Sequence, residues 1–157
     1  EVPYDIEGQK NWLSSSFNKP NYYHWIIQHD GKDVGLLKFV DWDQNQKITS
    51  WGFYIGEDSS LGIGGLVPPY FYNFAFDYLG VNMVRAELTF DNVNTIKLHL
   101  LQGYQFDPSR DHVITKKGNS ILMVCMNLEK KAFKKSRFIR LKKELPIDKW
   151  QGNPIKK

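Results

Sequence analysis

The chain has 157 residues and a mass of 18.4 kDa, with 41% hydrophobic and 15% aromatic residues, which is typical of one globular domain with a sizeable core. The net charge of +4 conceals an asymmetry, because residues 129–157 hold 11 Lys and Arg against 3 Asp and Glu and leave residues 1–128 acidic. The part before residue 129 therefore lacks the basic character of a nucleic-acid-binding domain, and no apolar run approaches the ~18 residues of a membrane-spanning helix.

The single cysteine, Cys125, lies in an apolar run and excludes an internal disulfide, which favours a reducing compartment. We therefore expect a cytoplasmic protein that has neither a membrane nor a nucleic acid as its partner. His24, His29 and His112 have no metal-ligand spacing with cysteines or carboxylates, so no metal site is expected.

The first half of the chain predicts one helix followed by an antiparallel meander. Apolar spacing indicates a helix over 4–17. Aromatic and β-branched runs, separated by an Asp-Gly turn and a polar turn, predict strands over 22–28, 34–42 and 48–55.

The second half alternates helices with strands. A helix is expected over 66–79, starting near Val67 because Pro68 and Pro69 are tolerated only in a first turn. A strand over 83–90 follows it, and then a second helix over 95–102 that ends at Gly103. The remaining pattern predicts strands over 104–106, 113–116 and 119–128.

A glycine-rich turn joins the strand that contains residues 51–55 to the helix over 66–79. Gly62, Gly64 and Gly65 would let an anion approach the backbone, where the first amides of the helix have no intrahelical partner. The alternative is a strand-to-helix turn in which glycines serve tight packing.

This turn resembles the pyrophosphate loop of the GNAT superfamily of acetyl-CoA-dependent N-acetyltransferases. That loop reads Gln/Arg-x-x-Gly-x-Gly/Ala between the fourth strand of the family and the next helix. Gly62 and Gly64 match both glycines, and Ser59 replaces the long polar residue.

A second motif resembles the same superfamily, whose members carry Asn-x-x-Ser/Ala-x-x-x-Tyr followed by Gly-Phe. The corresponding residues here are Asn92, Thr95 and His99, followed by Gly103 and Tyr104. The likeness covers about residues 22–128, and WGFYIG, DGKDVGLLKFVDWD and the AEL–DN–N–I–LH–GY pattern look most like the family branch of pseudaminic acid biosynthesis.

The resemblance implies an α/β (α+β) fold, with a GNAT-like mixed central sheet flanked by helices, mostly an antiparallel meander with a parallel pair around the cofactor cleft. It implies an acetyltransferase domain over 1–128 that lacks the family's N-terminal strand and first helix. Residues 129–157 then form a basic helical extension, with a helix expected over 129–145. That extension either contacts an anionic membrane or RNA, or is a solvated tail that packs one aromatic residue on the domain or contacts the expected N-terminal part.

Acetyl-CoA is the cofactor that the resemblance implies. In family members the fourth strand holds the pantetheine arm, loop amides take the pyrophosphate, and the motif helix meets the arm and its outer part. The corresponding residues are Phe53, Tyr54 and Ile55 for the arm, Ser60, Leu61, Gly62, Ile63, Gly64 and Gly65 for the pyrophosphate, and Asn92, Thr95 and Lys97 on the helix.

Two residues are catalytic candidates. His99 stands where the family has its leaving-group acid, a tyrosine, and a histidine can donate a proton if its pKa lies near neutrality. Glu87 is the candidate base for the amine, in a cleft shared with His99. The alternatives are a packed helix histidine, and a solvated carboxylate or a partner for Arg85.

The family branch implies a UDP-linked amino sugar as the small-molecule acceptor, and a homodimer is compatible with the resemblance. Asp41, Trp42 and Trp51 are candidate contacts for the sugar nucleotide; the alternatives are surface turn residues and a core tryptophan. Acetylation of a polyamine or a protein N-terminus is the alternative within the same fold. A non-enzymatic binding module that uses the basic extension is a third hypothesis.

Overall fold

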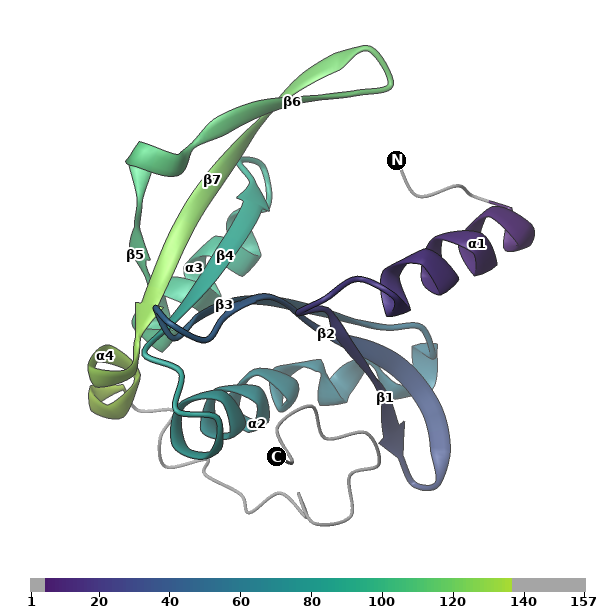
Figure 1. Ribbon diagram of the computed structural model, residues 1–157, viewed down its shortest axis with the longest axis horizontal. Helices are drawn as coiled ribbons and strands as arrows, with labels where there is room; N and C mark the ends of the chain where they lie inside the picture. Colours follow the sequence, from purple (N-terminus) through teal and green to yellow (C-terminus); the bar gives the residue numbers. More distant parts are fainter. Residues whose placement is uncertain (1–4, 137–157) are drawn as a thin grey trace.

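The computed structural model describes residues 5–136, apart from the side chains of Ser59 and Leu61. Seven strands form a single sheet in the order β1-β2-β3-β4-β7-β5, with β6 on β7. Every pair is antiparallel except β3–β4 (Figure 1), which confirms the predicted mixed sheet. The strands are β1 (Tyr23–His29), β2 (Lys32–Asp43), β3 (Ile48–Ile55), β4 (Met83–Thr89), β5 (Gln105–Phe106), β6 (His112–Lys116) and β7 (Asn119–Glu129).

Two tight turns set the hairpins of this sheet. Asp30 and Gly31 have φ of 49° and 76°, and Lys117 and Gly118 have φ of 51° and 76°. Consecutive left-handed residues match the right-handed twist of the flanking strands, which is why such turns close two-residue hairpins. The β6–β7 hairpin extends well beyond the end of β4 at the top of Figure 1.

The helices lie on both sides of the sheet, with α2 below β1–β3 and α1 on the opposite side in Figure 1. Among residues 5–136 no helix is long and apolar enough to cross a membrane. The helical segments are α1 (Ile6–Phe17), the 3-10 segment η1 (Asp58–Gly65), α2 (Val67–Asn73), the π-helical turn η2 (Phe74–Tyr78), α3 (Val93–Gln102), the 3-10 turn η3 (Pro108–Arg110) and α4 (Lys130–Lys135).

The segment over 66–79 begins where the prolines require, with α2 starting at Val67, but it is not one regular α-helix. It continues after Asn73 as the π-helical turn η2. The helix predicted over 129–145 is wrong in extent, because Ser136 adopts an extended conformation (φ −74°, ψ 155°) and ends α4 at Lys135. The rest of that prediction lies outside the described residues.

An aromatic core fills the space between the sheet and α2. Phe39 and Trp51 from the sheet meet Tyr72 and Phe76 from the helical segment. Phe133 of α4 joins them, with its ring centroid 5.2 Å from that of Tyr72, and is only 1% exposed. The chain after β7 thus packs an aromatic residue on the domain, as the second interpretation of the extension expects.

The parallel pair is short. β3 and β4 pair only from Ile48–Met83 to Ser50–Arg85, although β3 runs on to Ile55 and β4 to Thr89. Beyond Ser50 the described residues of the two strands make no further ladder contacts. The sheet therefore opens at Ser50, and we call this opening the split.

Candidate active site

The strand edge along the split comes from residues 51–55 of β3. These residues pair with β2 on one side and have no ladder partner on the β4 side within the described chain. Phe53 lies on the core face, stacked on Trp51 at 5.6 Å, whereas Tyr54 is 61% exposed. The backbone of Phe53, Tyr54 and Ile55 is thus free on one side to bind an extended ligand.

The glycine-rich segment after β3 forms the 3-10 helix η1 and not an open turn. In such a helix each N–H donates to the carbonyl three residues earlier, as the Ser60 N–H does to Glu57 O at 2.9 Å. Ser60 is buried, at 6% exposure. The expected free amides of Ser60, Leu61, Gly62, Ile63, Gly64 and Gly65 are therefore largely engaged within the segment.

The fold does not require the glycines of η1. A Cβ at Gly62 or Gly65 would meet no atom within 4 Å, and one at Gly64 would only reach Phe53 Cε2 at 3.9 Å. None of these residues has a left-handed φ. Since neither packing nor conformation demands glycine, close approach of a ligand to this backbone is the remaining physical reason for the cluster.

The start of α2 contributes few donors. Pro68 and Pro69 occupy its first turn and have no N–H, and Leu66 provides no side-chain cap. The expected anion site at the helix start is therefore weakened, and any phosphate site here depends mainly on η1.

The motif helix α3 starts with a conventional cap. Asn92 Oδ1 accepts a hydrogen bond from the Thr95 N–H at 3.4 Å, and Gly103, with φ of 104°, closes the helix. Lys97 is exposed on its surface. Capping the helix is thus a structural role for Asn92, and its contact with a cofactor remains a proposal.

His99 lies inside the protein. It is 8% exposed and stacks on Tyr104, and within residues 5–136 its Nδ1 has no hydrogen-bond partner. Burial lowers the pKa of His99 from 6.5 to about 4, so the imidazole is neutral at pH 7. The condition for a proton-donating histidine, a pKa near neutrality, is not met in this structure.

A buried polar network adjoins His99, and sequence reasoning missed it. The Trp51 indole N–H donates to the Tyr104 hydroxyl at 3.2 Å. The hydroxyls of Tyr104 and Tyr72 are hydrogen-bonded at 3.1 Å, and Tyr72 donates to Gln102 Oε1 at 2.9 Å. These residues come from β3, α2, α3 and the chain after it, so no local pattern could reveal the network.

Glu87 lies on the other face of the sheet. Strand alternation places Val84 and Ala86 in the core, and Arg85 and Glu87 opposite them, as expected. His99 packs on the core side through Tyr104, so the structure does not bring it into one cleft with Glu87.

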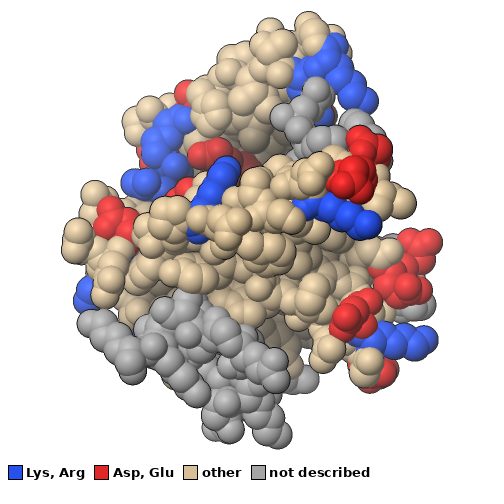
Figure 2. All heavy atoms as spheres, turned by 45° about the vertical axis from the view of Figure 1, so that its right-hand side comes forward, with Lys and Arg blue, Asp and Glu red and all other residues tan. Residues whose placement is uncertain are grey.

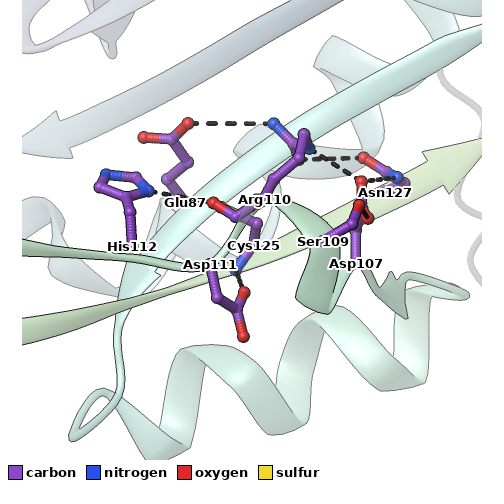
Figure 3. A network of polar contacts seen from close by, with 8 residues as sticks. All are labelled: Glu87, Asp107, Ser109, Arg110, Asp111, His112, Cys125 and Asn127. Carbon is purple, nitrogen blue, oxygen red and sulfur yellow. Dashed lines mark hydrogen bonds and ion pairs between the residues drawn. The ribbon is translucent and has the colours of Figure 1, made fainter.

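The partner of Glu87 is Arg110 and not Arg85. Arg110 Nη1 lies 3.9 Å from Glu87 Oε1, across the turn η3 (Figure 3). Arg110 also donates to Asp107 Oδ2 at 2.8 Å and to Asn127 Oδ1 at 3.1 Å. The helix α3 and the strand β5 lie between Glu87 and Arg110 in the sequence, so spacing alone gave no signal for this pair.

Asp107 anchors this network. It accepts hydrogen bonds from Ser109 Oγ at 2.6 Å, from Arg110 Nε and from Asn127 Nδ2 at 2.8 Å (Figure 3). These donors, led by Ser109, lower the pKa of Asp107 from 3.8 to about 2. The guanidinium beside Glu87 is therefore held in place from two sides.

The three candidate contacts for a sugar nucleotide have other partners. Asp41 lies in a bulge of β2 with φ of 54° and accepts from the Tyr22 hydroxyl at 2.9 Å, a hydrogen bond that raises the pKa of Tyr22. Trp42 packs 5.7 Å from Phe39. Trp51 stacks on Phe71 at 4.3 Å, as a core tryptophan would.

Comparison with known proteins is informative at the level of the fold. No protein-family profile and no curated protein sequence match the chain. Among solved structures, the spermidine N-acetyltransferase from Vibrio cholerae in complex with CoA and spermine superposes with a TM-score of 0.70 at 12% identity, over 85% of this chain and 80% of the other. The protein has the N-acetyltransferase fold.

Other structures of that enzyme agree. A dodecameric form from Vibrio cholerae gives a TM-score of 0.68 at 10% identity, over 83% of this chain and 78% of the other. A chimera of the Vibrio cholerae enzyme and hSSAT gives a TM-score of 0.69 at 11% identity, over 83% of this chain and 82% of the other. At such identities the likeness extends to the fold alone, and chemistry has to be argued from the residues of this chain.

Two hollows in the surface of this N-acetyltransferase fold lie away from the split. One of about 530 Å³ lies between Met83, Glu129 and Lys130, and one of about 330 Å³ lies between Gly103, Asp107 and Asn127. Neither is lined by a residue expected from the sequence to bind cofactor or acceptor. The candidate site is thus defined by the strand edge and the glycine segment and not by a deep cavity.

Proposed function

We propose that the protein is an acetyl-CoA-dependent N-acetyltransferase whose cofactor binds along the split. The observation that carries this proposal is the cluster of glycines in η1, which the fold does not need and which directly follows the free strand edge of β3. The N-acetyltransferase fold of the chain and the two motifs that resemble the GNAT superfamily support it.

Acetyl-CoA would supply an acetyl thioester, an electrophile that an amine can attack. The free edge of Phe53, Tyr54 and Ile55 would bind the pantetheine arm by backbone hydrogen bonds. The segment of Ser60, Leu61, Gly62, Ile63, Gly64 and Gly65 would bind the pyrophosphate, after η1 releases some of its internal hydrogen bonds. Asn92, Thr95 and Lys97 would lie beside the outer part of the cofactor.

Glu87 is the residue that we assign to the amine proton. It is a half-exposed carboxylate, it lies beside the Arg110 guanidinium, and it projects from β4 on the face opposite the core. We assign no proton transfer to His99, because a neutral imidazole with a pKa of about 4 is a poor acid at pH 7. Solvent at the open split would then supply the proton to the thiolate.

The acceptor is proposed to be a small molecule with a primary amine. A polyamine is supported by the names of the similar structures, one of which contains spermine. A UDP-linked amino sugar is supported only by the sequence resemblance. The comparisons favour the polyamine of these two.

The first experiment is a thermal-shift titration of the full chain with acetyl-CoA, with ATP and NADH as controls. A ligand that binds only the native state adds about 2.7 kcal/mol of stability at 100 times its Kd. A shift with acetyl-CoA alone supports the proposal, and equal shifts with all three ligands or with none would reject it. Acetyl transfer is then assayed with spermidine and with a UDP-linked 4-amino sugar.

A further inference from the structure

Arg110 faces Glu87 without forming a hydrogen bond to it. Its Nη1 lies 3.9 Å from Glu87 Oε1 (Figure 3), which is longer than the ~3.2 Å limit of an N–H···O hydrogen bond but close enough for the two charges to attract. Glu87 has no other polar partner among residues 5–136. Both of its oxygens therefore remain able to accept a hydrogen bond from an amine.

The other edges of the guanidinium are held by a closed ring of hydrogen bonds. Arg110 Nε donates to Asp107 Oδ2 at 2.8 Å, and Nη2 donates to Asn127 Oδ1 at 3.1 Å. Asn127 Nδ2 donates to the same Asp107 oxygen at 2.8 Å, which closes the ring. A planar guanidinium that is bound on two sides has a fixed orientation, so the direction in which Nη1 points is fixed as well.

The backbone that carries Arg110 is attached to the strand next to Glu87. Cys125 of β7 is the direct ladder partner of Glu87 on β4. The Asp107 N–H donates to Cys125 O at 2.8 Å, and the Cys125 N–H donates to Asp111 Oδ1 at 2.8 Å. The Cys125 thiol donates to Arg110 O at 3.2 Å. The turn η3 is thus fastened at the position directly opposite Glu87.

Pairs of opposite charge also occur elsewhere on the surface. Figure 2 shows acidic and basic side chains side by side on the face that it draws. Lys131 and Glu129 form such a pair at 2.9 Å, with side chains 80% and 50% exposed. Exposed pairs contribute little, because solvent screens them and both side chains stay flexible. Arg110 differs, because its side chain is only 24% exposed and is hydrogen-bonded on two sides.

We propose that Arg110 is a positioning residue for Glu87, which it holds in place by charge while leaving the carboxylate oxygens free for the amine. The inference rests on the proposed role of Glu87 as the base in acetyl transfer. A carboxylate that is held before the amine arrives loses less freedom in the reaction, and a small misplacement of a reacting group costs rate. The effect belongs in kcat, because neither residue lies among those assigned to the cofactor.

The first test is the kinetics of Arg110→Gln, with spermidine and a UDP-linked 4-amino sugar as acceptors. We expect kcat to fall about tenfold or more, as for a misplaced base, with unchanged acetyl-CoA affinity by calorimetry. Unchanged affinity also shows that the variant is folded. Lys131→Gln is the matched control, since it removes a cation from an exposed pair, and it should leave kcat unchanged.

A double-mutant cycle separates positioning from support of the turn. If Arg110 acts through Glu87, Arg110→Gln should cause little further loss of kcat in the Glu87→Gln background. A residue that only stabilises η3 would lower kcat by the same factor in both backgrounds.

Chemical rescue provides a readout that a purely structural role would not change. Guanidinium ion, at concentrations far below those that unfold proteins, should restore part of the kcat lost in Arg110→Ala. Urea has a similar shape and no charge, so it should not. Arg110→Lys should retain part of the wild-type rate, because it keeps the charge but cannot form the ring with Asp107 and Asn127.

The inference would be overturned by an unchanged kcat in Arg110→Gln, by equal losses in both backgrounds of the cycle, or by equal effects of guanidinium and urea. In these outcomes Glu87→Gln still lowers kcat, so the proposed function stands. An unchanged kcat in Glu87→Gln, or the absence of acetyl transfer to both acceptors by the wild type, would instead reject the role of Glu87 and the inference together.

Discussion

The His99 imidazole lies nearly flat on the Tyr104 ring, with 4.3 Å between the ring centroids and 21° between the planes. This contact places the one histidine of the α3 motif in the interior, where its charged form would lose solvation. The same contact turns His99 from a candidate acid into a group whose protonation opposes folding.

The stability of the protein should therefore fall on acidification. The unfolded state binds a proton to His99 near pH 6.5, and the folded state binds it only near pH 4. The stability that goes with a neutral His99 is therefore fully present above pH 6.5 and is lost as the pH drops toward 4. The loss from this residue should reach about 3 kcal/mol by pH 4. Urea unfolding of the wild type and of His99→Phe, which keeps the stack, measures it.

The variant His99→Phe should show a flatter dependence between pH 7 and pH 4 than the wild type. His112→Gln, at an exposed histidine of β6, serves as the control and should keep the wild-type dependence. Identical profiles for His99→Phe and the wild type would contradict the assignment.

Gly62→Ala should separate cofactor binding from stability. The new Cβ meets nothing within 4 Å and the backbone is not left-handed, so the melting temperature should stay or rise slightly. If the pyrophosphate approaches this backbone, the methyl group should weaken acetyl-CoA binding about tenfold or more, as an obstructed charge-assisted contact. Calorimetry and thermal unfolding give the two readouts.

Gly103→Ala is the contrasting variant. Gly103 has a φ of 104°, and a Cβ there would lie 3.4 Å from the Ala132 backbone, so this change should lower stability by about 1 kcal/mol or more. Unchanged acetyl-CoA affinity in Gly62→Ala would show that the pyrophosphate does not approach this backbone.

Glu87→Gln should lower kcat by about a hundredfold, the usual contribution of a positioned base, with little change in acetyl-CoA affinity. The amide keeps the shape of the side chain beside Arg110 but cannot take up a proton. Steady-state kinetics measure the effect. Glu129→Gln, at the end of β7 beside Lys131, is the control, and equal kcat for both variants would remove Glu87 from the mechanism.

Tyr72→Phe should destabilise the protein by about 1–3 kcal/mol, because it leaves the Gln102 carboxamide oxygen buried without its donor. Chemical denaturation measures this loss. Tyr54→Phe, at a largely exposed ring, should change stability by less than about 0.5 kcal/mol. A loss in Tyr72→Phe no larger than in Tyr54→Phe would show that solvent replaces the network.

The local parts of this structure can be predicted from the sequence. The strand predicted over 48–55 has those bounds, and the Asp30–Gly31 turn forms as its residue types require. Contacts between side chains that only the folded sheet brings together could not be predicted from the sequence. The approach of Arg110 to Glu87 depends on how η3 folds over β7 and β4, and neither residue has a local pattern that indicates the other.

The glycine segment shows a second limit. Residues 58–65 contain the motif, and their type predicts access for a ligand, but the choice between an open turn and η1 depends on hydrogen bonds such as that from Ser60 to Glu57. Glycine permits both conformations at similar cost. Composition alone therefore predicts the place of the site and not its resting conformation.

The brief ladder between β3 and β4 also determines the order in which the protein can assemble. Strands β1, β2 and β3 are neighbours in sequence and can associate early, whereas joining Ser50 to Arg85 requires the chain between them to collapse first. The split is consequently a late product of folding, and we expect mutations that loosen the aromatic core to abolish ligand recognition while the first hairpins persist.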